Sequence, residues 1–337
     1  LKMEKKPVLG ILLGDSAGVG PELVAKVAAS GFLSKYCNPV IIGDARIFER
    51  GLKTIGKTVL FFIVQGDEPF SWENGIPVLD EKNQNPDEIV MGKAQEVCGK
   101  ADLQMIETGV TLYQQGKIDG FCFAPLNKAA MIMGGSRFES EHHQLAELFH
   151  VTTPYGEINV LDHLMTTRAT SHIPIEKVSA ELTKTTVSNS IFLLDQTMKS
   201  AGNLAPKIAV SALNPHCGEN GLCGREEIDV IAPAVEQAQR EGVDVSGPYS
   251  ADVLFYRAFA GEFDGVVTMY HDQGQIALKL RGFERGVTVA GGMPAPITTC
   301  AHGSAYDIAG TGKVGTTSFE NAVKIAVKMA QTAKNKN

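Results

Sequence analysis

The sequence predicts an α/β protein, built as two domains or as one large α/β unit split by a cleft. Short apolar runs alternate with helical segments, which is typical of parallel strands joined by helical crossovers. The 337 residues exceed what a single compact core usually supports. With 44% hydrophobic residues and 35 glycines, the composition is that of a globular protein rich in tight turns.

Charge and hydropathy exclude several functions. The net charge of -7 and the lack of a basic patch argue against a general nucleic-acid binder or a protein of anionic membranes. No apolar stretch approaches the roughly 20 residues of a membrane span. Lys2, Glu4, Lys5 and Lys6 lead directly into a strand, so no signal peptide is expected. The sequence therefore predicts a cytoplasmic protein that binds neither nucleic acid nor membrane; the resemblance described below implies a small-molecule substrate.

Predicted strands and helices alternate regularly in the first part of the chain. Helices are expected from Pro21 onward, because proline suits a first helical turn, and over residues with helical periodicity further on. The predicted strands are Val8–Leu13, Pro39–Gly43, Val59–Val64, Ile76–Leu79 and Gly120–Phe123, and the other predicted helices are Ala45–Leu52 and Met91–Gln115.

The second part carries its polar residues where apolar runs end. The predicted strands are Met165–His172, Lys207–Ser211 and Val266–Tyr270; helices are expected from Glu141, from Gly224 through Gln239, over Pro248–Phe255, from near Gln275 and over Thr317–Lys334. Ligands of open α/β sheets bind at the carboxyl ends of strands, so the residues after these strands are candidates for a site.

A glycine loop follows the first predicted strand, in residues 14–22, GDSAGVGPE. A strand, a glycine loop and a helix N-terminus together can bind an anion. However, the loop matches neither GxGxxG nor a Walker sequence, and such turns are often purely structural. The sequence leaves both interpretations open.

The six cysteines are scattered without CxxC pairs, which indicates reduced, mostly buried thiols. Cys217 and Cys223 flank a glycine-rich turn and are a minor alternative as thiolate metal ligands.

Three histidines follow apolar runs and precede turns: His172, His216 and His271. Three imidazoles with an open position suit a catalytic divalent metal that polarises an alcohol or carbonyl oxygen. Taken alone, His271 with Asp272 could bind a metal, move a proton or cap the next helix. Two further histidines, His142 and His143, are adjacent on a predicted helix and point about 100° apart, so only one is expected to serve a site.

Seven motifs in order along the chain resemble the 4-hydroxythreonine-4-phosphate dehydrogenase family, called PdxA in vitamin B6 biosynthesis. They are GDSAGVGPE at 14–22, APLNK at 124–128, TSHIP at 170–174, LNPHCGENG at 213–221, ADVLF at 251–255, MYHDQGQIALK at 269–279 and AHGSAYDIAGTGK at 301–313.

The resemblance implies an NAD- or NADP-dependent, metal-requiring homodimeric oxidoreductase with a fold like that of isocitrate and isopropylmalate dehydrogenases. The metal would be Zn, Mg, Mn or Co. We expect residues 1–130 with 300–337 to form the domain with the cofactor loop. Residues 131–299 would then form the domain with the metal and substrate residues and the dimer interface.

The resemblance also assigns site residues, as follows. The metal ligands would be His172, His216 and His271, drawn from both subunits; the substrate residues His142, with His143 beside it, and Lys279; a further residue of the site Asp252; and the cofactor residues His302, Gly303, Ser304, Ala305 and Asp307. The enzyme would oxidise the secondary hydroxyl of a 3-hydroxy acid and help to decarboxylate the 3-keto product. His142 or Asp252 could act as base, while Lys279 would neutralise a substrate anion.

The chain departs from the family pattern at three positions. Thr288 and Ile297 stand where relatives usually have an asparagine and an arginine, and His143 replaces a threonine. Losing a bidentate arginine weakens recognition of a phosphate or carboxylate, unless Arg281 or Arg285 compensates.

These departures widen the range of functions. The substrate is expected to be 4-hydroxythreonine 4-phosphate or a related phosphorylated four-carbon acid, with a cis-dihydrodiol carboxylate as the alternative. A non-catalytic ligand-binding homologue is a rival from another class, against which the retained His172, His216, His271 and Lys279 argue. A phosphate-acetyltransferase-like enzyme, related by fold, is a third possibility with little support from the residues.

Overall fold

The computed structural model describes residues 5–66, 68–138 and 140–335. The chain packs into two compact units: unit 1 is Leu1–Val151 with Met293–Asn337, and unit 2 is Thr152–Gly292. These limits differ from the expected boundaries after residues 130 and 299, the first of which falls inside helix α5, Lys128–Met133.

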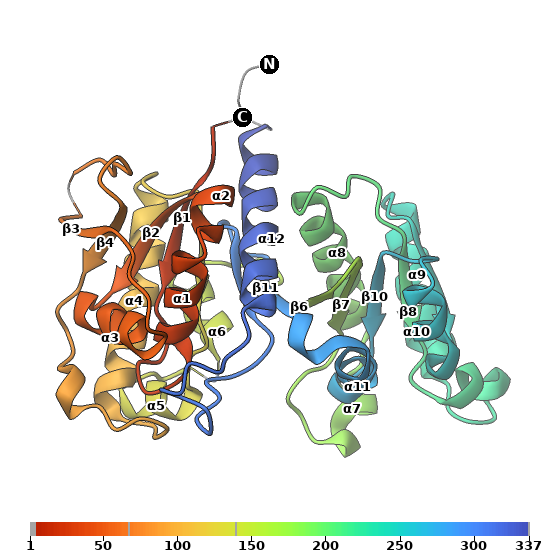
Figure 1. Ribbon diagram of the computed structural model, residues 1–337. Coiled ribbons are helices and arrows are strands. Elements are labelled where there is room, and N and C mark those ends of the chain that lie inside the picture. The colour runs from red at the N-terminus through yellow and green to blue at the C-terminus, as the bar shows by residue number, and fades with distance from the viewer. Residues whose placement is uncertain (1–4, 67, 139, 336–337) are drawn as a thin grey trace. The chain divides into compact units, whose positions relative to one another are not determined.

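Unit 1 contains a parallel sheet (Figure 1). Its strands lie in the order β3-β4-β2-β1-β5-β12. They are β1 Val8–Leu12, β2 Asn38–Gly43, β3 Phe61–Val64, β4 Ile76–Asp80, β5 Gly120–Phe123 and β12 Ile297–Cys300. Strands β1 and β5 are buried almost throughout, as expected for parallel strands covered on both faces.

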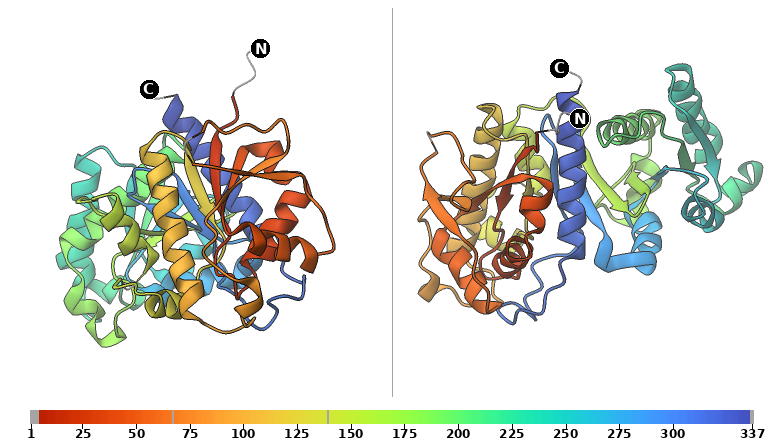
Figure 2. Two further views of the ribbon diagram at one scale, coloured as in Figure 1. Left: turned by 90° about the vertical axis from the view of Figure 1, so that its left-hand side faces the viewer. Right: turned by 45° about the horizontal axis from the view of Figure 1, so that its top comes forward.

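Two groups of helices flank this sheet (Figure 2). Helices α1, α2, α3 and α12 form one group, and α4, α5 and α6 form the other. Their bounds are α1 Gly20–Ala29, α2 Phe32–Tyr36, α3 Ala45–Thr54, η1 Pro86–Glu88, α4 Glu96–Gln114, α6 Glu141–Leu148 and α12 Thr317–Lys334. The expected helix over Met91–Gln115 therefore begins five positions later, after a turn held by the side chain of Gln95, which accepts from the Val90 amide.

Unit 2 contains a mixed sheet in the order β11-β6-β7-β10-β8-β9. Its strands are β6 Gly156–Leu161, β7 Leu164–Arg168, β8 Ile208–Ser211, β9 Val245–Tyr249, β10 Gly265–Thr268 and β11 Val287–Gly291. Strands β7, β10, β8 and β9 run parallel, whereas β6 pairs antiparallel with both β7 and β11. The antiparallel pairing of β6 and β7 follows from their tight connection, which forms a hairpin with no helical crossover between the strands.

The helices of unit 2 also pack in two groups, α8 with α9, and α10 with α11, each against strands of this sheet. Their bounds are η2 Ile175–Lys177, α7 Val178–Glu181, α8 Lys184–Ser200, η3 Pro215–Gly221, the π-helical turn η4 Glu227–Ile231, α9 Ala232–Arg240, α10 Ala251–Phe259, α11 His271–Gly282 and η5 Phe283–Arg285. No helix in the described part of the chain is long and apolar enough to cross a membrane.

One helix of unit 2 begins later than the sequence predicts. Pro248 and Tyr249 belong to β9 rather than to a helix over Pro248–Phe255, and α10 begins at Ala251. Because β9 is the edge strand of its sheet, proline is tolerated there without losing a bond of the central ladder.

Candidate active site

Three neighbouring strands of unit 2 lead into loops or helices that carry a histidine. Strands β7, β10 and β8 lie side by side and parallel, with Thr268 opposite Arg168 and Val267 opposite Val210. His172, His271 and His216 follow these strands in the same order. The three histidines therefore come from one carboxyl edge of the sheet, which is where α/β proteins bind ligands.

His271 is the first residue of α11, so this helix begins earlier than the expected start near Gln275. Its Nδ1 lies 2.7 Å from Oδ1 of Asp272. An Nδ1–H that donates to the carboxylate leaves the lone pair on Nε2, which is the arrangement common in metal-binding histidines. Asp272 makes this contact and no side-chain cap of the helix is formed, so the capping interpretation of the pair is not supported.

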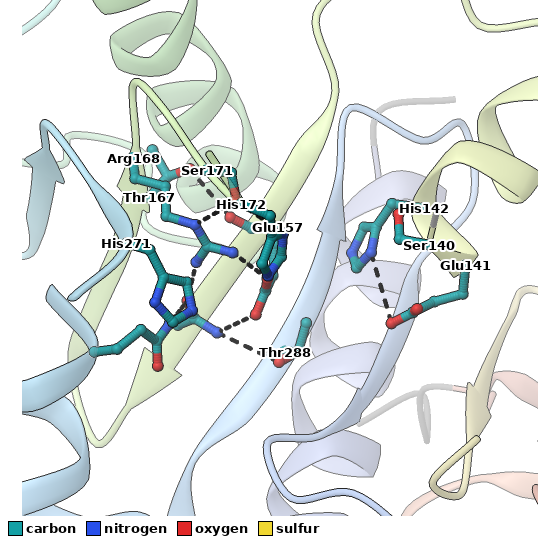
Figure 3. Close-up of polar contacts among 12 residues, drawn as sticks. Ser140, Glu141, His142, Glu157, Thr167, Arg168, Ser171, His172, His271 and Thr288 are labelled. Atoms are coloured by element: carbon teal, nitrogen blue, oxygen red, sulfur yellow. Dashed lines mark hydrogen bonds and ion pairs between the residues drawn. The ribbon is translucent and has the colours of Figure 1, made fainter. Parts of the chain in front are cut away.

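His172 lies beside His271. The expected strand over Met165–His172 ends at Arg168, and His172 follows in the loop. The two imidazole rings are 5.3 Å apart between centroids and inclined at 41° (Figure 3). Oγ of Ser171 lies 3.3 Å from Nδ1 of His172. Two imidazoles at this separation could supply two nitrogen donors to a metal ion.

His216 lies in a left-handed stretch of backbone. The φ angles from His216 to Asn220 are 50°, 56°, 74°, 45° and 58°, and only the central residue is glycine. Each non-glycine residue in this region costs about 1–2 kcal/mol. The buried carboxylate of Glu227 offsets part of this cost, because Oε1 accepts hydrogen bonds from the amides of Leu213 at 2.8 Å and Asn214 at 2.7 Å.

The three histidines do not form one ligand group within a single chain. Among residues 5–66, 68–138 and 140–335, no three His, Cys, Asp or Glu side chains are placed to hold a metal ion together. One chain thus pairs His172 with His271 and presents His216 separately, exposed on its own loop. Nitrogen donors at the pair suit a divalent metal, and the set is incomplete without a further ligand.

Asp252 and Lys279 are exposed residues of unit 2. The hydroxyl of Ser250 donates to Oδ1 of Asp252 at 2.7 Å, and this bond, with the charge of His216 as a smaller cause, holds the pKa of Asp252 below its usual value. Lys279 has its Nζ 5.9 Å from the ring centroid of Phe283. At spacings of four, His271, Gln275 and Lys279 lie on one face of α11.

The two adjacent histidines of unit 1, His142 and His143, differ in exposure. His142 is 8% exposed, and its Nε2 has no hydrogen-bond partner within the described residues. His143 is exposed and contacts Oγ of Ser140 through Nδ1 at 2.8 Å. The buried, unsatisfied nitrogen of His142 is the kind of group that a ligand would satisfy.

The predicted cofactor loop, residues 302–307, packs against the glycine loop of residues 14–22 within unit 1. The Val19 amide donates to the Ser304 carbonyl at 3.0 Å, and a Cβ on Gly18 would lie 2.8 Å from Ser304. Gly303 and Asp307 are exposed, and a Cβ on Gly303 would meet no atom within 4 Å. Exposed backbone at a glycine and an exposed carboxylate fit a dinucleotide and its ribose hydroxyls.

Backbone amides of the glycine loop donate hydrogen bonds to acceptors of the protein itself. The amide of Ala17 donates to Oδ1 of Asp15, and the phenol of Tyr306 donates to Oδ2 at 2.5 Å. Burial raises the pKa of Asp15, with these two hydrogen bonds opposing the shift. Of the two interpretations of this loop, the structural one is favoured, because its amides and its buried acid hold the cofactor loop rather than an anion.

The cysteines agree with the expectation of reduced thiols. All six are free, and Cys37, Cys98, Cys122 and Cys300 are buried. Burial raises the pKa of Cys98 to about 11, which makes it unreactive near neutral pH. Cys217 and Cys223 belong to no metal-binding group within the described chain.

Two of the departures from the family pattern, Thr288 and Ile297, are buried, and the contacts of Arg281 and Arg285 decide whether either arginine can compensate. Ile297 is 0% exposed, and Thr288 is buried and accepts a hydrogen bond from Asn159 Nδ2 at 3.4 Å. Arg285 is paired with Asp162 and Glu284, and the guanidinium of Arg281 lies 5.5 Å from the ring centroid of Phe259. The paired Arg285 is therefore a poor substitute for a substrate-binding arginine.

Sequence reasoning missed a polar cluster next to the histidine pair. Arg168, Glu157 and Asn159 are joined by hydrogen bonds on β6 and β7 (Figure 3). The signal available in the sequence was an arginine inside a run otherwise free of charge, MTTRATS, because a charged residue in a buried strand requires a partner.

Comparison with known proteins gives a consistent result. The family model described as "Pyridoxal phosphate biosynthetic protein PdxA" matches residues 35–326. A protein of Pseudomonas aeruginosa named "Putative 4-hydroxythreonine-4-phosphate dehydrogenase 2" is 40% identical over 96% of this chain and 97% of its own length. One of Oceanobacillus iheyensis named "Putative D-threonate 4-phosphate dehydrogenase" is 37% identical over 98% and 100%.

The fold agrees with these relatives. The crystal structure of 4-hydroxythreonine-4-phosphate dehydrogenase from Klebsiella pneumoniae is similar with a TM-score of 0.86 at 34% identity, covering 98% of this chain and 100% of the other. The predicted α/β class, like that of isocitrate dehydrogenase, is thus confirmed. From motifs, family model and structure together, the chain belongs to the PdxA family and is an oxidoreductase of the dehydrogenase type.

Proposed function

We propose that the protein is a metal-dependent, NAD- or NADP-linked dehydrogenase that oxidises the secondary hydroxyl of a four-carbon 3-hydroxy acid phosphorylated at its far end. The observation that carries this proposal is the position of three histidines after three adjacent parallel strands, β7, β10 and β8. A scaffold without catalysis has no physical need for this arrangement.

The reaction needs a proton acceptor, a hydride acceptor and a means to polarise oxygen. His172, His271 and His216 would hold a divalent cation, which would supply Lewis-acid polarisation of an oxygen. The hydroxyl proton passes to a base of the protein as the C3 hydride passes to the nicotinamide. The resulting 3-keto acid then loses CO2, and the carbon left behind takes up a proton.

We assign the base to His142 rather than Asp252. The lowered pKa of Asp252 makes its carboxylate a weak proton acceptor that stays ionised, so its role is electrostatic. His142 offers a buried Nε2 with no partner in the described chain. Lys279, exposed on the same face of α11 as His271, neutralises a substrate anion.

The substrate is expected to differ from the one in the name of the Pseudomonas relative. An arginine replaced by the wholly buried Ile297 removes a charge-assisted contact of roughly 1.5–3 kcal/mol, or about one to two powers of ten in affinity. We therefore expect 4-hydroxythreonine 4-phosphate to be turned over poorly, and 4-phosphothreonate, the class named for the Oceanobacillus relative, is the first alternative substrate to test.

A screen of NAD and NADP reduction tests this assignment. Purified protein with Mg²⁺, Mn²⁺, Co²⁺ or Zn²⁺ is given the two phosphorylated acids, 4-phosphoerythronate and a cis-dihydrodiol carboxylate. Thr288→Asn, which restores the asparagine of the family pattern, is the variant to compare with the unaltered chain. The side chain at position 288 already accepts a hydrogen bond from Asn159, so a polar residue is tolerated there. Ile297→Arg is unsuitable, since it would bury a charge. Highest turnover of the dihydrodiol, or of 4-hydroxythreonine 4-phosphate by the unaltered chain, would contradict the substrate proposal.

We further propose that two copies share each site, His216 of one completing the pair of the other. Two observations support this arrangement: no three ligands meet in the described part of one chain, and unit 2 exposes large apolar side chains. Leu222, Tyr256 and Leu280 are 88%, 81% and 85% exposed, which suits burial against a second copy.

Subunit complementation tests the shared site. His172→Ala and His216→Ala chains are each expected to be inactive as homodimers. Co-expressed at equal levels, they should regain about a quarter of the wild-type activity, because half of the dimers are mixed and each mixed dimer has one intact site. If all three ligands came from one chain, every site would lack one ligand and no activity would return.

A further inference from the structure

An ion pair lies in the sheet of unit 2 at the end of β7. The side chain of Arg168 is 6% exposed, and its Nη2 donates to Oε2 of Glu157 on the neighbouring strand β6. A buried guanidinium is stable only when paired and hydrogen-bonded. The family motifs include neither residue, so the pair is a feature that the proposed reaction has not yet used.

The guanidinium is held in one orientation by three acceptors. Besides the bond to Glu157, Nη1 donates to Oδ1 of Asn159 at 3.0 Å, and Nε donates to Oγ of Ser171 at 2.9 Å. Asn159 also donates from Nδ2 to Oε1 of Glu157 at 2.7 Å. Because the fork of Arg168 is planar, three separate acceptors fix its position, which a lysine could not achieve.

Residues of this cluster form hydrogen bonds with Ser171, next to His172, and with Gln275, one helical turn from His271 (Figure 3). Oγ of Ser171, held by Arg168, lies 3.3 Å from Nδ1 of His172. On the other side, Nε2 of Gln275 donates to Oδ1 of Asn159 at 2.5 Å, and Gln275 is one helical turn from His271. One polar cluster thus connects to the loop of His172 and to the helix of His271.

We propose that Arg168 is a positioning residue that orients His172 through Ser171, and that Glu157 holds Arg168 and cancels its charge. The inference rests on the proposed function, because it assumes that His172 binds the metal. Charge explains why both residues are needed. A lone guanidinium beside the imidazole pair would repel a cation, whereas the Arg168–Glu157 pair supplies rigid donors with no net charge.

Binding of Co²⁺ to the metal-free protein provides the test, with the visible absorption of bound Co²⁺ as a readout independent of turnover. We expect Arg168→Met to weaken Co²⁺ binding about 10- to 100-fold, the usual effect of removing the support of a metal ligand, and to change the spectrum. Arg168→Lys should recover only part of the affinity, because it keeps the charge but not the fork. Glu157→Gln should weaken binding as well, because it leaves the charge of Arg168 uncompensated.

A double-mutant cycle examines the route through Ser171. Ser171→Ala changes an exposed residue, so the fold should be retained, and it should weaken Co²⁺ binding on its own. If Arg168 acts through Ser171, the Arg168→Met/Ser171→Ala protein should bind Co²⁺ no more weakly than Arg168→Met alone. Fully additive losses would overturn the inference.

Arg257→Met is the matched control. Arg257 is another ion-paired arginine of unit 2, bonded to Glu262 at 2.5 Å and stacked near the rings of Tyr249 and Phe263. It should leave the Co²⁺ affinity and spectrum unchanged. Wild-type affinity and spectrum in Arg168→Met, or a raised KM for substrate with normal Co²⁺ binding, would refute the positioning role. Failure of the wild-type protein to bind Co²⁺ through His172 would instead refute the proposed function.

Discussion

In unit 1, the polar residues that follow β1 are buried against other parts of the chain, whereas in unit 2 the histidines that follow β7 and β8 remain exposed. Asp15, after β1, receives the Ala17 amide and the Tyr306 phenol inside the unit. His172 and His216 are exposed, and the ring of His271 is partly so.

The difference shows how one sequence signal, a polar cluster at a strand end, can serve two purposes. Where the chain itself satisfies the polar atoms, as around Asp15, the cluster holds a loop in place. Where it does not, the cluster is available to a ligand. The left-handed backbone at His216 strengthens this distinction, since strained conformations persist where surrounding contacts impose them and often mark functional sites.

The largest effect is expected from His216→Ala, which tests whether the exposed histidines are functional. Removing one of three ligands should reduce bound metal to well below one ion per subunit and lower kcat/KM more than about 100-fold. Metal analysis and NAD(P) reduction are the measurements. Cys223→Ser is the control on the same loop and should retain both metal and activity; if the cysteine variant lost metal instead, thiolate ligation would replace the histidine assignment.

The next effect concerns the cofactor loop, where Gly303→Val should raise the KM for NAD(P) about tenfold with a smaller change in kcat. A Cβ at this position would meet no protein atom within 4 Å, so the loss is expected to report on the ligand rather than on folding. Gly315→Val is the matched control, because a Cβ there also meets nothing within 4 Å. An unchanged cofactor KM, with substrate binding impaired, would mean that the dinucleotide binds elsewhere.

A third prediction tests the buried acids of unit 1 through stability. Burial, with repulsion from Asp15 as a smaller cause, raises the pKa of Asp102 well above its usual value. The folded state therefore binds more protons than the unfolded state above the unfolded pKa, and stability falls as pH rises toward the folded pKa. Asp102→Asn cannot lose this proton, so its Tm should exceed that of the wild type by a margin that grows from pH 5 to pH 8. A margin independent of pH would show that Asp102 is not held neutral.

The smallest effect is expected at Glu81, where burial raises the pKa from 4.5 to about 7. The wild type should lose stability as pH rises between those two values, and Glu81→Gln should be more stable at pH 8 by on the order of 2 kcal/mol. Denaturant unfolding at pH 4.5 and pH 8 measures this difference. Glu107→Gln, an exposed acid on α4, is the control and should show no such dependence.

The sequence by itself determined much of the local structure and supplied the candidate residues of the site. Strand β2 and helix α12 begin and end within one residue of their expected limits, because apolar runs, helical periodicity and turn residues act over short distances. The motifs placed the three histidines after apolar strands and the cofactor loop near the C-terminus. They also identified His142, whose burial separates it from its neighbour His143.

Only the tertiary structure decided which of these elements are neighbours. The order β7-β10-β8 joins segments distant in sequence, and no local pattern specifies such pairing. The antiparallel β6 brings Glu157 and Asn159 beside Arg168. Glu227, which follows the glycine-rich turn, accepts hydrogen bonds from the Leu213 and Asn214 amides before His216, and no sequence pattern specifies this contact. Side-chain partners of this kind depend on long-range packing, so the cluster of Arg168, Glu157 and Asn159 could be found only in the folded chain.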